Sequence, residues 1–148
     1  MNRAKWLIVG VLAAGAVLTG CGTPAESAPE KPARVVPVQG TSLSRVVLTP
    51  KAAERVGLMT APVQTLSTPG AGPASSTVPL AAVVYLADGT TWVYTVPEPL
   101  TYVRQSVTIA GVAGDVAVLK AGPAPGTQVV TVGAAELLGS EYGVAGGQ

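Results

Sequence analysis

The fold is decided by residues 78–96, which read Val-Pro-Leu-Ala-Ala-Val-Val-Tyr-Leu-Ala-Asp-Gly-Thr-Thr-Trp-Val-Tyr-Thr-Val. Two apolar runs, residues 80–87 and 90–96, stand on either side of the dipeptide Asp88-Gly89. Aspartate followed by glycine is a strong signal for a two-residue hairpin loop, because a type I′ turn needs a positive φ at both central positions. The stretch therefore predicts two antiparallel strands that pair directly with each other.

The predicted register of this hairpin places Tyr85 opposite Trp92 and Val83 opposite Tyr94 on one side of the sheet. The other side of the hairpin is also mostly apolar. Two explanations fit this pattern: the rest of the domain covers the hairpin on both sides, or the hairpin presents an aromatic face to a partner. Burial of these side chains in a core is the favoured explanation.

Outside the hairpin, short strands alternate with turns that are rich in glycine and proline. Thr49 and Pro50 predict the start of a helix of two turns at most, as its N-cap and first helical residue, and Gly57 predicts its end. Further extended segments are predicted at residues 45–48, 58–63, 102–109, 115–119 and 128–132, and one more helical turn at 134–138. The sequence thus predicts an all-β domain over residues 43–148, dominated by short antiparallel strands with one or two very short helices.

The composition excludes several classes of active site and favours a protein that is not an enzyme. The 148 residues contain no histidine and one cysteine, which removes histidine-dependent nucleophiles and histidine- or cysteine-rich zinc sites. No pair of carboxylates lies on one constrained element, as general acid–base catalysis would need. Nine basic and eight acidic side chains give no net charge that favours nucleic acid. We therefore expect no catalysis, metal ion, cofactor or nucleic-acid partner.

The start of the chain has the layout of a secretory signal. Arg3 and Lys5 precede an uncharged, mostly apolar run at residues 6–18, and small residues follow it. A transmembrane anchor needs about 20 predominantly apolar residues, and this run is too short for one. The next residues, Leu18-Thr19-Gly20-Cys21, resemble the lipobox of bacterial lipoproteins, in which the cysteine thiol takes a diacylglycerol and becomes the mature N-terminus.

The lipobox resemblance implies that residues 1–20 are removed and that Cys21 anchors the chain to the extracytoplasmic face of the cell membrane. Two or more acyl chains make such an anchor stable. Ordinary secretion with a free thiol at Cys21 is the alternative. Residues 21–42 contain four prolines among charged and small side chains, which predicts a flexible tether. The valines at 35, 36 and 38 are apolar enough to pack against the domain, so the sequence does not fix the residue at which the tether ends.

Four segments of the domain, at residues 46–63, 78–94, 102–107 and 126–138, carry a second resemblance. Taken in order, they resemble periplasmic adaptor subunits (membrane fusion proteins) of resistance-nodulation-division efflux pumps. The first is similar to the segment near the mature start of these adaptors, and the others to their membrane-proximal C-terminal domain. Full adaptors carry a lipoyl-like domain, a helical hairpin and a barrel domain after the first segment, where this chain has only residues 67–77.

This second resemblance implies a lipid-anchored minimal adaptor or accessory subunit that contacts an inner-membrane transporter permease through its β-domain. Without the helical hairpin, which docks an outer-membrane channel in the family, the chain does not bridge a three-part pump. Tyr85, Trp92 and Tyr102 are the expected contact residues, unless they belong to the core. The alternative function is a cell-envelope binding module that recognises a wall polymer or a small ligand without a transporter.

Overall fold

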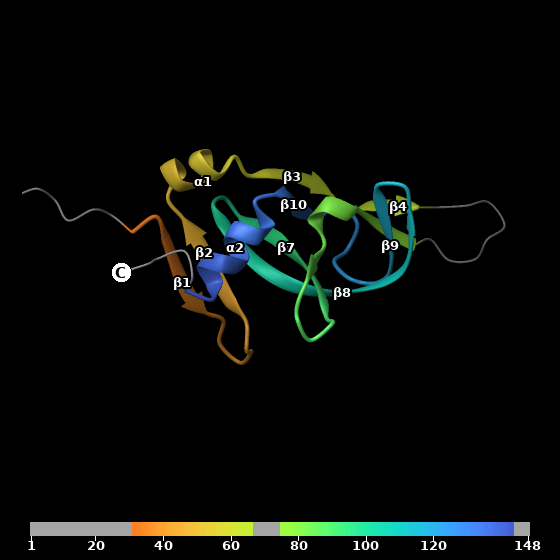
Figure 1. Cartoon of the computed structure of the whole chain (residues 1–148), viewed down its shortest axis with the longest axis horizontal. Helices are drawn as coiled ribbons and strands as arrows, with labels where there is room; N and C mark the ends of the chain where they lie inside the picture. The colour runs from red at the N-terminus through yellow and green to blue at the C-terminus, as the bar shows by residue number, and fades with distance from the viewer. Residues whose placement is uncertain (1–30, 67–74, 144–148) are drawn as a thin grey trace, which may run out of the picture. The chain divides into compact units, whose positions relative to one another are not determined.

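Ten strands and two short α-helices make up the part of the chain that the structure, a computed structural model, describes: residues 31–66 and 75–143 (Figure 1). All the strand pairings there are antiparallel. The predicted all-β fold class with short helices is therefore confirmed. The predicted signal peptide, the lipobox and most of the predicted tether lie outside the described residues.

The strands are β1 Ala33–Pro37, β2 Ser44–Leu48, β3 Met59–Pro62, β4 Gln64–Leu66, β5 Ser75–Pro79, β6 Val84–Tyr85, β7 Thr91–Glu98, β8 Thr101–Ala113, β9 Val116–Ala121 and β10 Gln128–Val132. The α-helices are α1 Pro50–Val56 and α2 Ala134–Glu141, and one 3₁₀ turn, η1, spans Leu80–Ala82.

The sheet curls until its two ends meet. Its strands follow the order β3-β10-β7-β8-β9-β5-β4, and β1 and β2 extend it from the first part of β8. The end strands β3 and β4 are separated in the chain by Val63 alone, so this order closes on itself. Val63 fixes the closure, because its N–H donates to Thr127 and its C=O accepts from Gly126, both at 2.8 Å.

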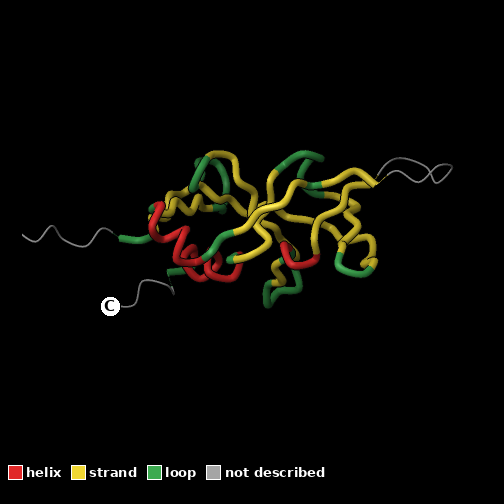
Figure 2. Tube along the Cα trace, turned by 90° about the horizontal axis from the view of Figure 1, so that it is seen from above, coloured by secondary structure: helices red, strands yellow, loops and turns green. Residues whose placement is uncertain are grey.

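Two hydrophobic cores lie on opposite sides of the curled sheet. The inner core, inside the curl, is built by Val63 and by buried side chains of β5, η1, β7, β8, β9 and β10: Val78, Ala82, Val93, Val107, Ala117, Leu119 and Val129. The outer core lies between the sheet and the two α-helices, which share one end of the molecule (Figure 2): Val46, Leu48, Ala52, Tyr94, Tyr102, Val130, Ala134 and Leu137. Strands β7 and β10 contribute to both cores, so their consecutive residues are buried on opposite faces.

Helix α1 forms as its sequence predicts. The Thr49 side chain accepts a hydrogen bond from the Ala52 N–H at 3.2 Å, and Pro50 occupies the first turn. Gly57 ends the helix in the left-handed conformation, with φ at 67°. All three signals act within a few residues, which is why sequence alone could place this helix.

The predicted register of the 78–96 hairpin is wrong by one residue. Tyr85 pairs with Thr91, and Val84 pairs with Trp92. The Leu86 N–H donates to the Thr90 carbonyl, which leaves a three-residue loop, and only Gly89 in that loop has a positive φ. This geometry is a turn followed by a left-handed residue, not the type I′ turn that needs a positive φ at the aspartate as well. Before the hairpin, residues 80–82 form η1 and not a strand.

The domain also begins earlier than the predicted boundary at residue 43. Strand β1, assigned to the tether from its prolines, pairs with β2 along its whole length. The Val38 N–H donates to Leu43 and the Thr49 N–H donates to Pro32, so the even-numbered residues of β1 turn their backbone groups toward β2. Pro37 therefore stands where an edge strand needs no donor, and a proline is tolerated there.

Gly133, which precedes α2 with φ at 90°, is a site where a side chain should not fit. An added Cβ would overlap the Leu58 side chain, and alanine is strained at this φ. We expect Gly133→Ala to lower the free energy of unfolding by about 1–3 kcal/mol. Gly139→Ala, inside the same helix with open space around its Cβ position, should instead raise it by about 0.5–1 kcal/mol. Urea unfolding measures both, and equal midpoints would contradict the packing of α2 against Leu58.

Candidate functional site

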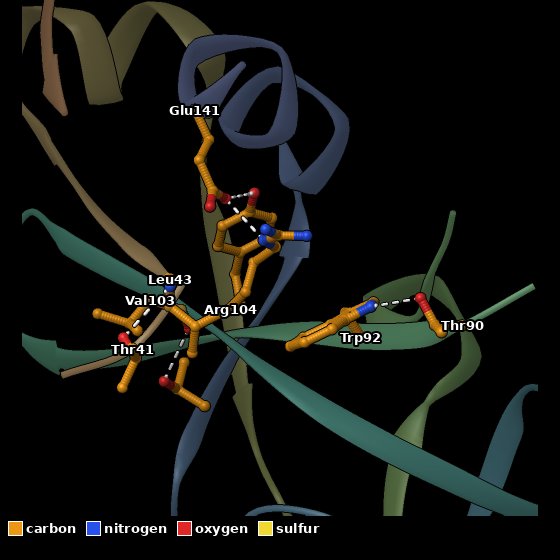
Figure 3. A network of polar contacts seen from close by, with 9 residues as sticks. Thr41, Leu43, Thr90, Trp92, Val103, Arg104 and Glu141 are labelled. Carbon is orange, nitrogen blue, oxygen red and sulfur yellow. Dashed lines mark hydrogen bonds and ion pairs between the residues drawn. The ribbon is translucent and has the colours of Figure 1, made fainter. Parts of the chain in front are cut away.

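A polar cluster, here called the Arg104 cluster, joins the sheet to the end of α2 (Figure 3). Arg104 on β8 pairs across the sheet with Tyr94 on β7. Its Nε lies 2.8 Å from Oε2 of Glu141, and the Tyr94 hydroxyl donates to the same oxygen at 2.7 Å. The Arg104 guanidinium also lies 4.9 Å from the ring centre of Trp92 and 5.3 Å from that of Tyr142.

The ion pair at the centre of the Arg104 cluster is buried, and its two charges lie against each other. The side chains of Arg104 and Glu141 are 8% and 5% exposed. Burial is the largest single influence on the pKa of Arg104 and would lower it, but the charge and the hydrogen bond of Glu141, together with Tyr142 and Tyr94, outweigh it and the pKa is raised. Burial, with the hydrogen bond to Glu141, raises the pKa of Tyr94 as well. The guanidinium therefore stays charged and the phenol stays protonated at neutral pH, and together they hold α2 on the outer core.

Sequence reasoning missed this cluster. The alternation of residues 102–109 places Arg104 on the polar side of its strand, and the C-terminal position of Glu141 suggests a solvated residue. Both side chains are buried because α2 folds back over that side of the sheet. The one signal in the sequence is an arginine within a largely apolar strand, and its partner lies too far along the chain to be recognised.

An open hollow of about 670 Å³ lies beside the Arg104 cluster and shares Trp92 with it. It is bordered by the loop and strands of the 84–98 hairpin and by the middle of β8. Its lining residues are aromatic, hydroxylated or apolar: Tyr85, Gly89, Thr90, Thr91, Trp92, Ser106, Val107, Thr108 and Ile109. Its volume falls within the range of about 300–1,000 Å³ that is usual for small-molecule sites.

The Trp92 side chain is held in place at this hollow. Its indole N–H donates to Thr90 Oγ1 at 2.7 Å (Figure 3). The Thr90 hydroxyl donates in turn to Asp88 Oδ1 at 2.6 Å. The Thr90 backbone N–H donates to the same aspartate oxygen at 2.9 Å. These two bonds from Thr90 lower the pKa of Asp88. With Arg104 over its ring, Trp92 forms a wall that is ordered before any ligand arrives.

The structure brings together two of the three expected contact residues. Tyr85, whose exposed fraction is 61%, and the half-buried Trp92 both line the hollow. Tyr102 is 5% exposed and belongs to the outer core, where burial raises its pKa. Its aromatic ring packs under the helices and leaves almost no surface for a partner. The predicted lipidation motif, Leu18 to Cys21, lies outside the described residues.

Two further features bear on the kind of site that the described part of the chain can hold. Within residues 31–66 and 75–143, no group of three or more histidine, cysteine, aspartate or glutamate side chains is placed to hold a metal ion. Over the same residues, no helix combines the length and apolar character needed to cross a membrane.

Comparison of the whole chain with known proteins identifies no relative: no protein-family model, no curated protein and no solved structure matches it.

Proposed function

We propose that the mature protein is a lipoprotein anchored on the outer face of the cell membrane, where it acts without catalysis as a minimal adaptor or accessory subunit of an efflux or transport system. The observation that carries this proposal is the exposed aromatic surface at the hollow. Tyr85 and Trp92 both line it, and they belong to a hairpin held by its own hydrogen bonds. A preformed aromatic surface is typical of sites that bind a partner.

The polar side chains near the hollow support a role in binding a partner and not in catalysis, because they are used to hold the fold together. Glu141 forms an ion pair with Arg104 and accepts a hydrogen bond from Tyr94 inside the fold, and Asp88 accepts two hydrogen bonds from Thr90. A catalytic acid or base must reach its substrate, and these groups are committed to holding α2 and the hairpin.

The adaptor resemblance is supported by how its first and last segments lie in the fold. Strand β3, from the first segment, pairs with β10, from the last. The domain therefore closes with only residues 67–74 between β4 and β5, where full adaptors carry their middle domains. A chain of this length can present the membrane-proximal part of an adaptor without the rest.

Co-purification tests this function. After mild detergent extraction at native expression, we expect the protein to be recovered with an inner-membrane permease. Tyr85→Ala should reduce that recovery, because it removes the exposed ring at the hollow. Met59→Ala, which removes an equally exposed side chain (61%) on β3, should leave it unchanged. Repeated recovery of the wild-type protein alone would contradict the proposal.

A second candidate function has its own supporting observation. The hollow combines aromatic and apolar walls with several hydroxyl groups, as expected of a site for a small ligand. The protein would then be a cell-envelope binding module that recognises a wall polymer or a small ligand independently of a transporter.

A further inference from the structure

We infer that the hollow beside Trp92 binds an uncharged, polyhydroxylated ligand, that is, a neutral carbohydrate. This inference rests on the second candidate function and names its ligand class. It is argued from three features of the lining: the absence of charge, the hydroxyl groups that the described part of the fold leaves without a partner, and the fixed aromatic wall.

The lining favours an uncharged ligand. None of its nine residues carries a charge at neutral pH. Of the charged side chains next to the lining, Arg104 is paired with Glu141, and the Asp88 carboxylate, beside Gly89, stays negatively charged while its Oδ1 accepts two hydrogen bonds from Thr90. Lys120, in the β-bulge opposite Thr108 and Ile109, is exposed and does not line the hollow. An anionic ligand would lose water without gaining a counter-charge from the lining, which is costly.

The hydroxyl groups divide into two sets. Thr90 and Thr91 are used by the fold, since Thr90 binds Asp88 and Trp92, and the Thr91 hydroxyl donates to the Val107 carbonyl at 2.7 Å. The hydroxyls of Tyr85, Ser106 and Thr108 have no hydrogen-bond partner among the described residues. Each of these three can both donate and accept, as can the hydroxyls of a sugar. They supply the polar contacts of the proposed site.

The aromatic side chains supply the apolar contacts. A sugar ring has a face of C–H groups that packs on an aromatic ring, so it buries apolar area while its hydroxyls stay hydrogen-bonded. Trp92 is already held by Thr90 and Arg104, so binding costs little side-chain entropy there. Ser106 pairs directly with Trp92 across β7 and β8, which places a free hydroxyl beside this wall.

The test uses the fluorescence of Trp92. The chain has two tryptophans, and Trp6 lies in the predicted signal peptide, so the mature protein should carry Trp92 alone. The whole chain would be expressed, and the processed protein would be purified in a detergent without a sugar head group. It would be titrated with maltotriose and chitotriose, two uncharged trisaccharides, and with trigalacturonate, a charged one. Calorimetry on the same samples measures binding that does not change the emission.

We expect saturable binding of at least one uncharged trisaccharide, and weaker or no binding of trigalacturonate. Tyr85→Ala should weaken the binding about tenfold. Met59→Ala should leave it unchanged, and circular dichroism checks that both variants are folded.

Three results would overturn the inference: no saturable binding of either uncharged trisaccharide by fluorescence or calorimetry, equal affinity for trigalacturonate, or equal affinity in Tyr85→Ala. Failure of this inference is distinguishable from failure of the adaptor function. Recovery of the protein with a permease, without sugar binding, would overturn the sugar site and leave the adaptor function supported. Sugar binding by a protein that is always recovered alone would support the binding module and contradict the adaptor.

Discussion

Replacing Arg104 with methionine is expected to lower the free energy of unfolding by about 3–5 kcal/mol. The variant leaves the Glu141 carboxylate, with a side chain only 5% exposed, buried without its positive partner. It also removes the cation that packs on the rings of Trp92 and Tyr142. Because domains of this size are stabilised by about 5–15 kcal/mol, the loss should be obvious in urea unfolding followed by circular dichroism.

Two further variants make this prediction specific. Arg55→Met, at an exposed position of α1, should change the free energy of unfolding by no more than about 0.5 kcal/mol. Arg104→Met combined with Glu141→Gln should be less destabilising than Arg104→Met alone, since no unpaired charge stays buried. If Arg104→Met lowers the free energy of unfolding by less than about 1 kcal/mol, the value for a surface ion pair, it would contradict a buried ion pair that holds α2 on the sheet.

The second large effect is expected from Cys21→Ser, which removes the thiol that the lipobox resemblance assigns to lipidation. The variant should lose its anchor and appear in the aqueous fraction, or it should remain uncleaved with residues 1–20 attached. Either result follows because serine cannot form the thioether. Phase partitioning in detergent, with the size of the product on a gel, measures both outcomes.

Ser27→Ala, a substitution within the predicted tether, is the control for Cys21→Ser and should leave both processing and partitioning unchanged. A Cys21→Ser variant that is processed normally and still partitions with the membrane would contradict the lipid anchor.

What the sequence could predict follows from how far apart the interacting residues lie. Helix α1 was predictable because Thr49, Pro50 and Gly57 act within two turns of chain. The closure of the sheet was not, since it depends on β3 pairing with β10, which lies far along the chain. The pattern of residues that are apolar on both sides of β7 indicated cover on both faces, and the two cores explain it.

The candidate site was predictable only in part. Tyr85 and Trp92 were recognised as aromatic residues on one hairpin, and they do line one hollow, although not as a directly opposed pair. That difference depends on the φ angle of one loop residue, Asp88, which the dipeptide signal does not determine. The partnership of Arg104 with Glu141 depends on where α2 packs, and nothing local in either segment indicates it.

One mass measurement decides whether this domain belongs on a membrane at all. We would extract the protein from native membranes and determine the mass of its N-terminal tryptic peptide, which should end at Arg34. The proposed function predicts a peptide that begins at Cys21 and carries a thioether-linked diacylglycerol. A peptide with a free Cys21 thiol, or a mature chain that still contains residues 1–20, would contradict it.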